Sequence, residues 1–223
     1  MFLRTDTFHD RRDAGSRLAA ALERFKDDKP VILALPRGGV PVAFEVARAL
    51  DAELDLLLVR KIGAPGHQEL AIGAVVDGKN PQLVLNHEII AHAAPPPGYI
   101  EAEQKRQLTE IERRRQLYRG DEPPPDLKGR TVIVIDDGIA TGASMKAALR
   151  GVRQNEPQRL ILAVPVAPPD TLQDLAKKCD EIVCLFAPEW FNAVGSHYVD
   201  FSQTTDEEVV ALLAEAKAQR RSD

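Results

Sequence analysis

Short, unbroken apolar runs alternate along this chain with segments whose apolar residues recur every three or four positions. Each run is bounded by glycine, proline or charged residues, which is typical of a buried strand. The segments between the runs have the spacing of helices that bury one face. The predicted strands lie at residues 31–35, 54–59, 131–135, 160–166 and 181–186, and the helices between them lie at 40–50, 142–154 and 170–178.

This alternation predicts an α/β fold, in which helices cover both faces of a mostly parallel sheet. The order strand, helix, strand over residues 31–59 further predicts a parallel pair joined by a right-handed crossover. Outer helices are expected from the same periodicity at residues 10–26 and 206–219. The second of these starts with a capping box, because Thr205 and Glu208 can each satisfy an orphan amide.

The middle of the chain interrupts the alternation. Glycine and proline punctuate residues 60–81, and only residues 71–76 resemble a strand, so we expect a long mobile loop or a hairpin there. A short strand at 83–85 and a short helix at 86–93 follow. A charged helix at 99–120 lies between two proline-rich breaks.

Composition narrows the class of protein. Of the 223 residues, 44% are hydrophobic and 28% are charged, which is ordinary for a globular protein. No run approaches the roughly 20 apolar residues that a membrane span requires, and the N-terminal residues lack the apolar core of a signal peptide. The net charge of −5 argues against general affinity for nucleic acids. The two cysteines, Cys179 and Cys184, cannot build a disulfide framework, which fits a reducing cytoplasm. We therefore expect a cytoplasmic protein that binds neither membranes nor nucleic acids.

The stretch VIVIDDGIATGAS at residues 132–144 carries the first candidate site. Its strand delivers Asp136 and Asp137 to the carboxyl edge of the sheet, where ligands of such folds bind. The turn that follows starts a helix, and the amides of residues 140–144 would point outward with the partial positive charge that favours a phosphate. A phosphate cradle beside two carboxylates suits a phosphorylated sugar, whose hydroxyls or metal ion the acids would contact. The alternative, a capped helix after a strand, leaves both carboxylates unexplained.

This stretch resembles the signature sequence of the type I phosphoribosyltransferases, which combines an apolar strand, two acidic residues and a small-residue loop. The resemblance implies a Rossmann-like fold and a donor substrate, 5-phosphoribosyl-1-pyrophosphate. By this resemblance, Asp136 and Asp137 bind the ribose hydroxyls and contact Mg²⁺, directly or through water. The 5′-phosphate would lie in the loop formed by Ala140, Thr141, Gly142, Ala143 and Ser144.

Two other stretches fit the same resemblance. LPRGGVP follows the first strand, where the family has its pyrophosphate loop; Arg37 offers a bidentate cation, and Gly38 and Gly39 allow close backbone approach. After the second strand, the family has a flexible loop that closes over the active site. Arg60 and Lys61 are the basic residues there, and as catalytic residues they would stabilise the departing pyrophosphate. The alternative is a solvated hairpin whose basic side chains contact nothing.

Residues 187–201 follow the last strand, where the family recognises its acceptor base. Trp190 or Phe191 would stack on such a base, or else both simply cover the core. Oxopurine-specific relatives commonly have a lysine nearby. Residues 179–201 contain no lysine, which argues against an ordinary guanine or hypoxanthine substrate.

The resemblance covers a core at about residues 30–85 and 130–200 of what we interpret as one domain, residues 1–223. The insertion at residues 86–128 is expected to form a small hood over the acceptor site together with the N- and C-terminal segments. A solvated helix or a dimer contact is the alternative for this insertion. Its three arginines at 113–115 are interpreted as surface residues.

Two functions fit these features. The first is an enzyme that transfers the 5-phosphoribosyl group to a nitrogenous acceptor, expected to be a nucleobase, and releases pyrophosphate with Mg²⁺ as cofactor. An acceptor that is a small amine rather than a nucleobase stays open. The second function is a non-catalytic sensor that binds the same donor or a nucleotide. A homodimer is expected only because type I members are commonly dimers.

Overall fold

The centre of the molecule is a sheet of five strands in the order β2-β1-β6-β7-β8. The computed structural model describes residues 7–78 and 81–220, so the other residues of the predicted domain 1–223 lie outside the described part. Every neighbouring pair of strands is parallel, which confirms the expected α/β fold. The strands are β1 (Val31–Ala34), β2 (Glu53–Leu56), β6 (Thr131–Ile135), β7 (Arg159–Val166) and β8 (Glu181–Phe186).

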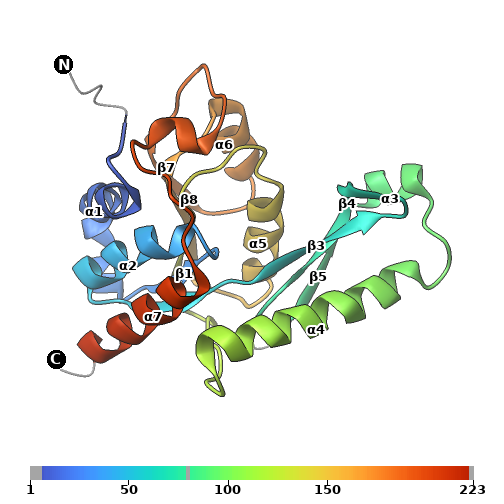
Figure 1. Cartoon of the computed structure of the whole chain (residues 1–223), viewed down its shortest axis with the longest axis horizontal. Helices are drawn as coiled ribbons and strands as arrows, with labels where there is room; N and C mark the ends of the chain where they lie inside the picture. The colour runs from blue at the N-terminus through green and yellow to red at the C-terminus, as the bar shows by residue number, and fades with distance from the viewer. Residues whose placement is uncertain (1–6, 79–80, 221–223) are drawn as a thin grey trace.

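Helices cover both faces of this sheet, as Figure 1 shows. Successive side chains of a strand point to opposite faces. In β1, Ile32 packs into one apolar layer, whereas Val31 and Leu33 pack into the other. The first layer is covered by α1 (Arg11–Leu22), α2 (Gly39–Leu50) and α7 (Asp206–Arg220), and the second by α5 (Ala143–Arg153) and α6 (Pro169–Leu175).

The first and last helices begin with side-chain caps. The Asp10 carboxylate accepts the amide of Asp13 at 2.9 Å and starts α1, which ends at Leu22 rather than at residue 26. A 3₁₀ helix, η1 (Glu23–Asp28), continues it. At α7, the Thr205 hydroxyl accepts the amide of Glu208 at 3.1 Å, as the capping box predicts.

No helix of the described residues is long and apolar enough to cross a membrane.

Residues 59–78 and 81–119 form a second unit, here called the arm, which projects from the main sheet (Figure 1). The first strands of the arm, β3 (Val59–Ala64) and β4 (His67–Val76), pair antiparallel, so the chain forms the hairpin that was one of the two expectations. The next strand, β5 (Gln82–Leu85), pairs with β4 and not with the parallel sheet. The helices of the arm are α3 (His87–Ala93) and α4 (Tyr99–Arg119), and α4 packs along β3 and β4.

The two ends of the described chain contact different parts of the molecule. Helix α1 packs on α2 and contacts β7 and β8, whereas α7 packs on α2 and β2 and contacts α4 of the arm. The hairpin β3–β4, predicted as core, belongs to the same unit as the predicted insertion. The division into a core and a hood over the acceptor site stays a prediction.

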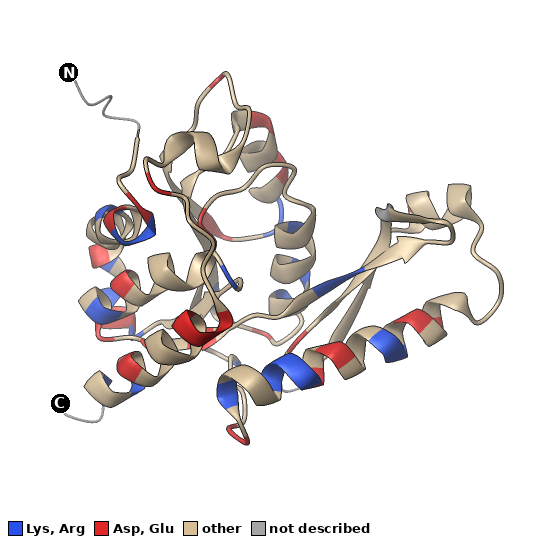
Figure 2. Cartoon of the chain, viewed as in Figure 1, with Lys and Arg blue, Asp and Glu red and all other residues tan. Residues whose placement is uncertain are grey.

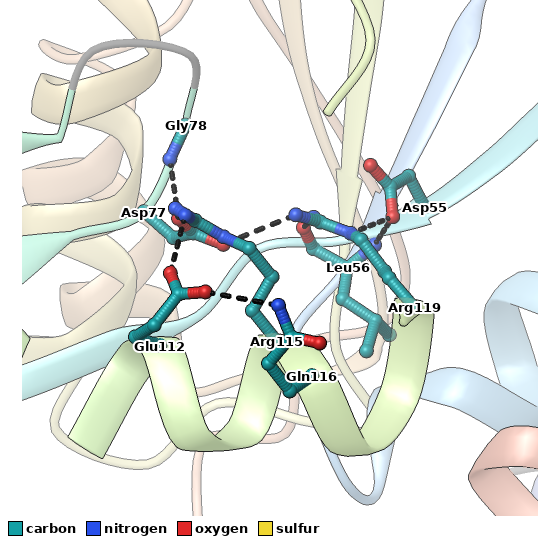
Figure 3. A network of polar contacts seen from close by, with 8 residues as sticks. All are labelled: Asp55, Leu56, Asp77, Gly78, Glu112, Arg115, Gln116 and Arg119. Atoms are coloured by element: carbon teal, nitrogen blue, oxygen red, sulfur yellow. Dashed lines mark hydrogen bonds and ion pairs between the residues drawn. The ribbon is translucent and has the colours of Figure 1, made fainter. Parts of the chain in front are cut away.

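A buried ion-pair network joins the arm to the main sheet (Figure 3). Asp55 lies in β2 and Asp77 directly follows β4, and the two carboxylates contact Arg119 of α4 at 2.5 Å and 3.3 Å. The side chains of Asp77 and Arg119 are 1% and 7% exposed, and Arg115 also pairs with Asp77. Burial raises the pKa of Asp55, and the Arg119 guanidinium opposes this rise. Since a buried charge needs its partners, the network holds the base of the arm in one position.

Candidate active site

Asp136 and Asp137 follow β6 directly and lie at the carboxyl edge of the parallel sheet. Asp136 Oδ1 accepts the amide of Asp137 at 2.9 Å, and Asp137 Oδ2 accepts Nε–H of Arg11 at 2.8 Å. Burial and repulsion from Asp137 raise the pKa of Asp136. Burial also raises the pKa of Asp137, whereas Arg11 lowers it. Within the described residues, Arg11 is the one ion-pair partner of the two acids, so the pair can accept further positive charge or hydroxyl donors.

The loop at residues 35–39, here called the glycine loop, follows β1. It lies against these acids because β1 and β6 are neighbours in the sheet. The Leu35 amide donates to the Ile135 carbonyl at 2.9 Å. A Cβ atom on Gly38 would lie 2.1 Å from Asp137 Oδ2, and one on Gly39 would lie 2.8 Å from the Ile135 carbonyl oxygen. These two glycines are therefore needed for close packing against the end of β6, and their role at a pyrophosphate stays a prediction.

Arg37 extends from this loop toward the start of α7. The Pro36–Arg37 peptide bond is cis. Arg37 Nη1 lies 3.6 Å from Asp206 Oδ1, and the Tyr118 hydroxyl donates to the same oxygen at 2.6 Å. Desolvation and this hydrogen bond raise the pKa of Tyr118 to about 12. Arg37 therefore shares its ion-pair partner, Asp206, with Tyr118, and it lies beyond hydrogen-bond distance from that carboxylate.

The loop at residues 140–144 presents free amides at the start of α5. None of these amides donates to an acceptor within the described part of the chain, and the first helical hydrogen bond runs from the amide of Lys146 to Gly142. Gly142 has φ +72°, which favours glycine. The Thr171 hydroxyl donates to the Ala140 carbonyl at 2.8 Å and fixes the loop from outside. The amides and the helix dipole together suit an anion.

Arg60, at the start of β3, lines one cavity together with one residue of the acid pair and one residue of the loop at 140–144, here called the amide loop. The cavity has a volume of about 150 Å³ and is lined by Arg60, Asp136 and Ser144, among others. Lys61 is the next residue along β3, so its side chain points to the opposite face, and it is exposed. Among the described residues, Arg60 lines the cavity together with Asp136, whereas Lys61 does not line it.

The segment after β8 has one exposed and one packed aromatic ring. Trp190 is 91% exposed, so the interpretation that it covers the core is wrong. Phe191 stacks on His197 with ring centroids 5.5 Å apart and packs beside the small cluster that contains Tyr198. The Tyr198 hydroxyl donates to the backbone carbonyl of Asp137 at 2.6 Å, which ties this segment to the acid pair.

Comparison with known families gives a match to the phosphoribosyl transferase domain over residues 5–202. This chain belongs to the phosphoribosyl transferase domain family. A Mycobacterium tuberculosis protein named "Putative phosphoribosyl transferase" is 44% identical over 209 residues, which make up 94% of this chain and 47% of that protein. The chain spans about half the length of the curated relatives it matches. The crystal structure of TT1426 from Thermus thermophilus is 48% identical, with a TM-score of 0.82 over 94% of this chain and 98% of that one.

Membership in the phosphoribosyl transferase domain family confirms the resemblance from which the donor site was predicted. The structure brings the acid pair, the glycine loop, the amide loop and Arg60 to one sheet edge. Within the described residues, no group of three or more His, Cys, Asp or Glu side chains could hold a metal ion by itself.

Two supporting residues escaped prediction from the sequence. Arg11 is 126 positions from Asp137, and its guanidinium also donates to the Ser202 carbonyl at 2.6 Å and lies 4.0 Å over the Phe201 ring. The hydroxyl of Tyr198 donates to the backbone carbonyl of the same aspartate. Nothing in the local sequence marks Arg11, because an arginine in the first turn of an amphipathic helix is normally solvated.

Replacing Gly38 by alanine is expected to destabilise the domain by about 1–3 kcal/mol, because the new methyl group collides with Asp137 Oδ2. The backbone is not the reason, since φ at Gly38 is −59°, which any residue adopts. Urea unfolding measures the loss. In an Asp137→Ala background the carboxylate that the new methyl group would meet is gone. The loss of unfolding free energy caused by Gly38→Ala should therefore be much smaller there. An equal cost in both backgrounds would show that the contact is not the cause.

Proposed function

We propose that this domain transfers the 5-phosphoribosyl group of 5-phosphoribosyl-1-pyrophosphate to a nitrogenous acceptor, which we expect to be a nucleobase, and releases pyrophosphate. The observation that carries the proposal is that a half-buried acid pair and a loop of unpartnered amides lie at one sheet edge. A ligand with adjacent hydroxyls and a phosphate matches that arrangement. Membership in the phosphoribosyl transferase domain family supports the same donor.

Each part of the donor has a chemically matched partner. The carboxylates of Asp136 and Asp137 would accept the ribose hydroxyls, and the amides of residues 140–144 would bind the 5′-phosphate. By the family resemblance, the backbone at Gly38 and Gly39 would bind the pyrophosphate. Arg37 would move from Asp206 to a phosphate oxygen, which is favourable because its present contact, at 3.6 Å, is weak.

The acid pair fits Mg²⁺ that is shared with the donor. Carboxylate oxygens are hard ligands, and Mg²⁺ commonly binds through one or two carboxylates together with substrate phosphates and waters. Asp136 suits this role because it lines the cavity and forms no ion pair within the described residues. When bound, the ion would neutralise charge on the leaving pyrophosphate.

In the proposed reaction, the bond from C1′ to the pyrophosphate oxygen breaks and a bond from C1′ to the acceptor nitrogen forms. The acceptor nitrogen releases its proton to water, and the electron pair of the broken bond leaves on pyrophosphate. Asp136 and Asp137 would hold the ribose while positive charge develops at C1′. Arg60 faces the same cavity and would stabilise the leaving group. Within the described residues, Lys61 has no contact that supports its predicted role, so this mechanism gives the role to Arg60.

The acceptor part of the proposal rests on the segment after β8. The indole of Trp190 is almost fully exposed and offers a flat face for an aromatic base. Phe191 instead stacks on His197 and would help to hold this segment in place. Since residues 179–201 contain no lysine, we propose an acceptor other than an oxopurine.

Donor and Mg²⁺ together are expected to raise the melting temperature by about 5–10 °C at a donor concentration of about 100 Kd, because a ligand that binds only the folded state stabilises it by about 2.7 kcal/mol there. Differential scanning fluorimetry measures the shift. Inorganic phosphate at the same ionic strength is the control and should give a smaller one. An unchanged melting temperature at millimolar donor would contradict the proposal, for the enzyme and for the sensor alike.

A further inference from the structure

Three consecutive arginines on α4 have three different environments. Arg113 is 62% exposed and pairs with Glu110 in solvent. Arg115 belongs to the buried network at the base of the arm. Arg114 is half-buried and lines the cavity of about 150 Å³ described above. The interpretation of this cluster as surface is therefore correct for Arg113 only. Figure 2 shows how basic and acidic residues alternate along this helix.

The cavity is where the arm and the donor site meet. Besides Arg114, its lining comes from the glycine loop, the segment after β2, the acid pair and the amide loop. These residues are Leu35, Pro36, Leu57, Leu58, Val59, Arg60, Asp136 and Ser144. Arg60 and Arg114 are its two cations.

Both guanidinium groups are held so that their outer nitrogens stay free. Arg114 donates from Nε to Glu110 at 2.9 Å, and Arg60 donates from Nε to the Gln107 carboxamide at 3.0 Å. The Gln107 amide in turn donates to Glu103 at 2.6 Å, which fixes its orientation. Within the described residues, the Nη atoms of Arg60 and Arg114 have no hydrogen-bond partner. Two guanidinium groups with unpartnered outer nitrogens thus line a cavity whose lining includes one carboxylate, that of Asp136.

We infer that Arg114 binds the pyrophosphate group of the donor together with Arg60, so that helix α4 supplies part of the donor site. This inference rests on the proposed function. Guanidinium groups match phosphate oxygens bidentately, and the terminal nitrogens of Arg114 are the ones left for such a contact. Glu110 positions Arg114 through Nε, and its pKa of about 2, lowered by Arg113 and Arg114, keeps it ionised in this role. The network at Arg119 then matters for the site, because it fixes the helix that carries Arg114.

Isothermal titration calorimetry of the full chain with Mg²⁺ tests this inference, using the donor, pyrophosphate alone and ribose 5-phosphate. The Arg114→Ala variant is expected to raise the Kd of the donor and of pyrophosphate by about tenfold to a hundredfold, the effect of losing one charge-assisted contact. Its Kd for ribose 5-phosphate should be unchanged, because that ligand has no pyrophosphate. The Arg113→Ala variant loses a neighbouring arginine on the same glutamate and should bind all three ligands as the unmodified chain does.

The outcomes separate this inference from the proposed function. Donor binding by the unmodified chain with an unchanged Kd in Arg114→Ala would overturn the role of Arg114 and leave the proposed function standing. An equal loss for ribose 5-phosphate would also overturn it, by placing Arg114 at the 5′-phosphate. If the unmodified chain binds no donor, the proposed function fails, and the inference with it. The Arg114→Lys variant controls for misfolding of Arg114→Ala. It keeps the positive charge, so its affinity for the donor should lie between those of the unmodified chain and of Arg114→Ala. A folded Arg114→Lys variant that binds no better than Arg114→Ala would contradict a cationic role.

Discussion

The Asp137→Asn variant is expected to lose turnover by about tenfold to a hundredfold while its free energy of unfolding changes by less than about 1 kcal/mol. Turnover falls because the amide no longer offers a charged acceptor to the ribose hydroxyls, a contact worth about 1.5–3 kcal/mol. Stability is spared because two effects oppose each other. The substitution relieves repulsion with Asp136, whereas Arg11 keeps an oxygen acceptor but loses its ionic partner.

Steady-state kinetics and urea unfolding on the same preparation measure the two quantities. Asp121→Asn is the matched control, since it makes the same chemical change at an exposed position outside the site, and both quantities should stay unchanged. A variant at Asp137 that unfolds easily but keeps its specific activity would show that the aspartate has a structural role instead.

The Arg119→Met variant is expected to lose about 3–5 kcal/mol of the free energy of unfolding. Methionine keeps much of the volume but leaves the Asp55 carboxylate, and one side of Asp77, without a cation in a buried setting. The arm should also become less firmly attached to the main sheet, because the network joins β2 to α4 (Figure 3).

Chemical unfolding and hydrogen exchange of the amides in β3 to β5 measure these effects. Arg113→Met on the same helix is the control, because its ion pair is exposed and worth at most about 1 kcal/mol. A loss of similar size in both variants would mean that the burial of the network contributes nothing specific.

The main sheet was predictable because its strands are buried on both faces and therefore read as unbroken apolar runs. β6 and β7 are examples, with nearly every residue buried. The acid pair was predictable for the opposite reason, since Asp136 and Asp137 contradict the run that precedes them. Where the chain passes from core to turn, a change of residue type is visible along a short stretch of sequence.

The arm was not predictable in the same way. Its hairpin depends on pairing of β3 with β4 and on packing of α4 over both, which local periodicity does not encode. The three arginines at 113–115 look alike in the sequence, and only the direction of each side chain around the helix separates solvent, cavity and network. Arg11 likewise gains its partner from a distant part of the chain, at Asp137.

Transfer of label from the donor to an acceptor tests the central claim most directly. The unmodified chain, incubated with Mg²⁺, donor labelled in the ribose and a panel of purines, pyrimidines and small amines, is predicted to release pyrophosphate with at least one acceptor. The label should appear in that acceptor's product, and the Asp137→Asn variant should form it far more slowly. Tight donor binding without transfer to any member of the panel would contradict the claim and would favour a sensor.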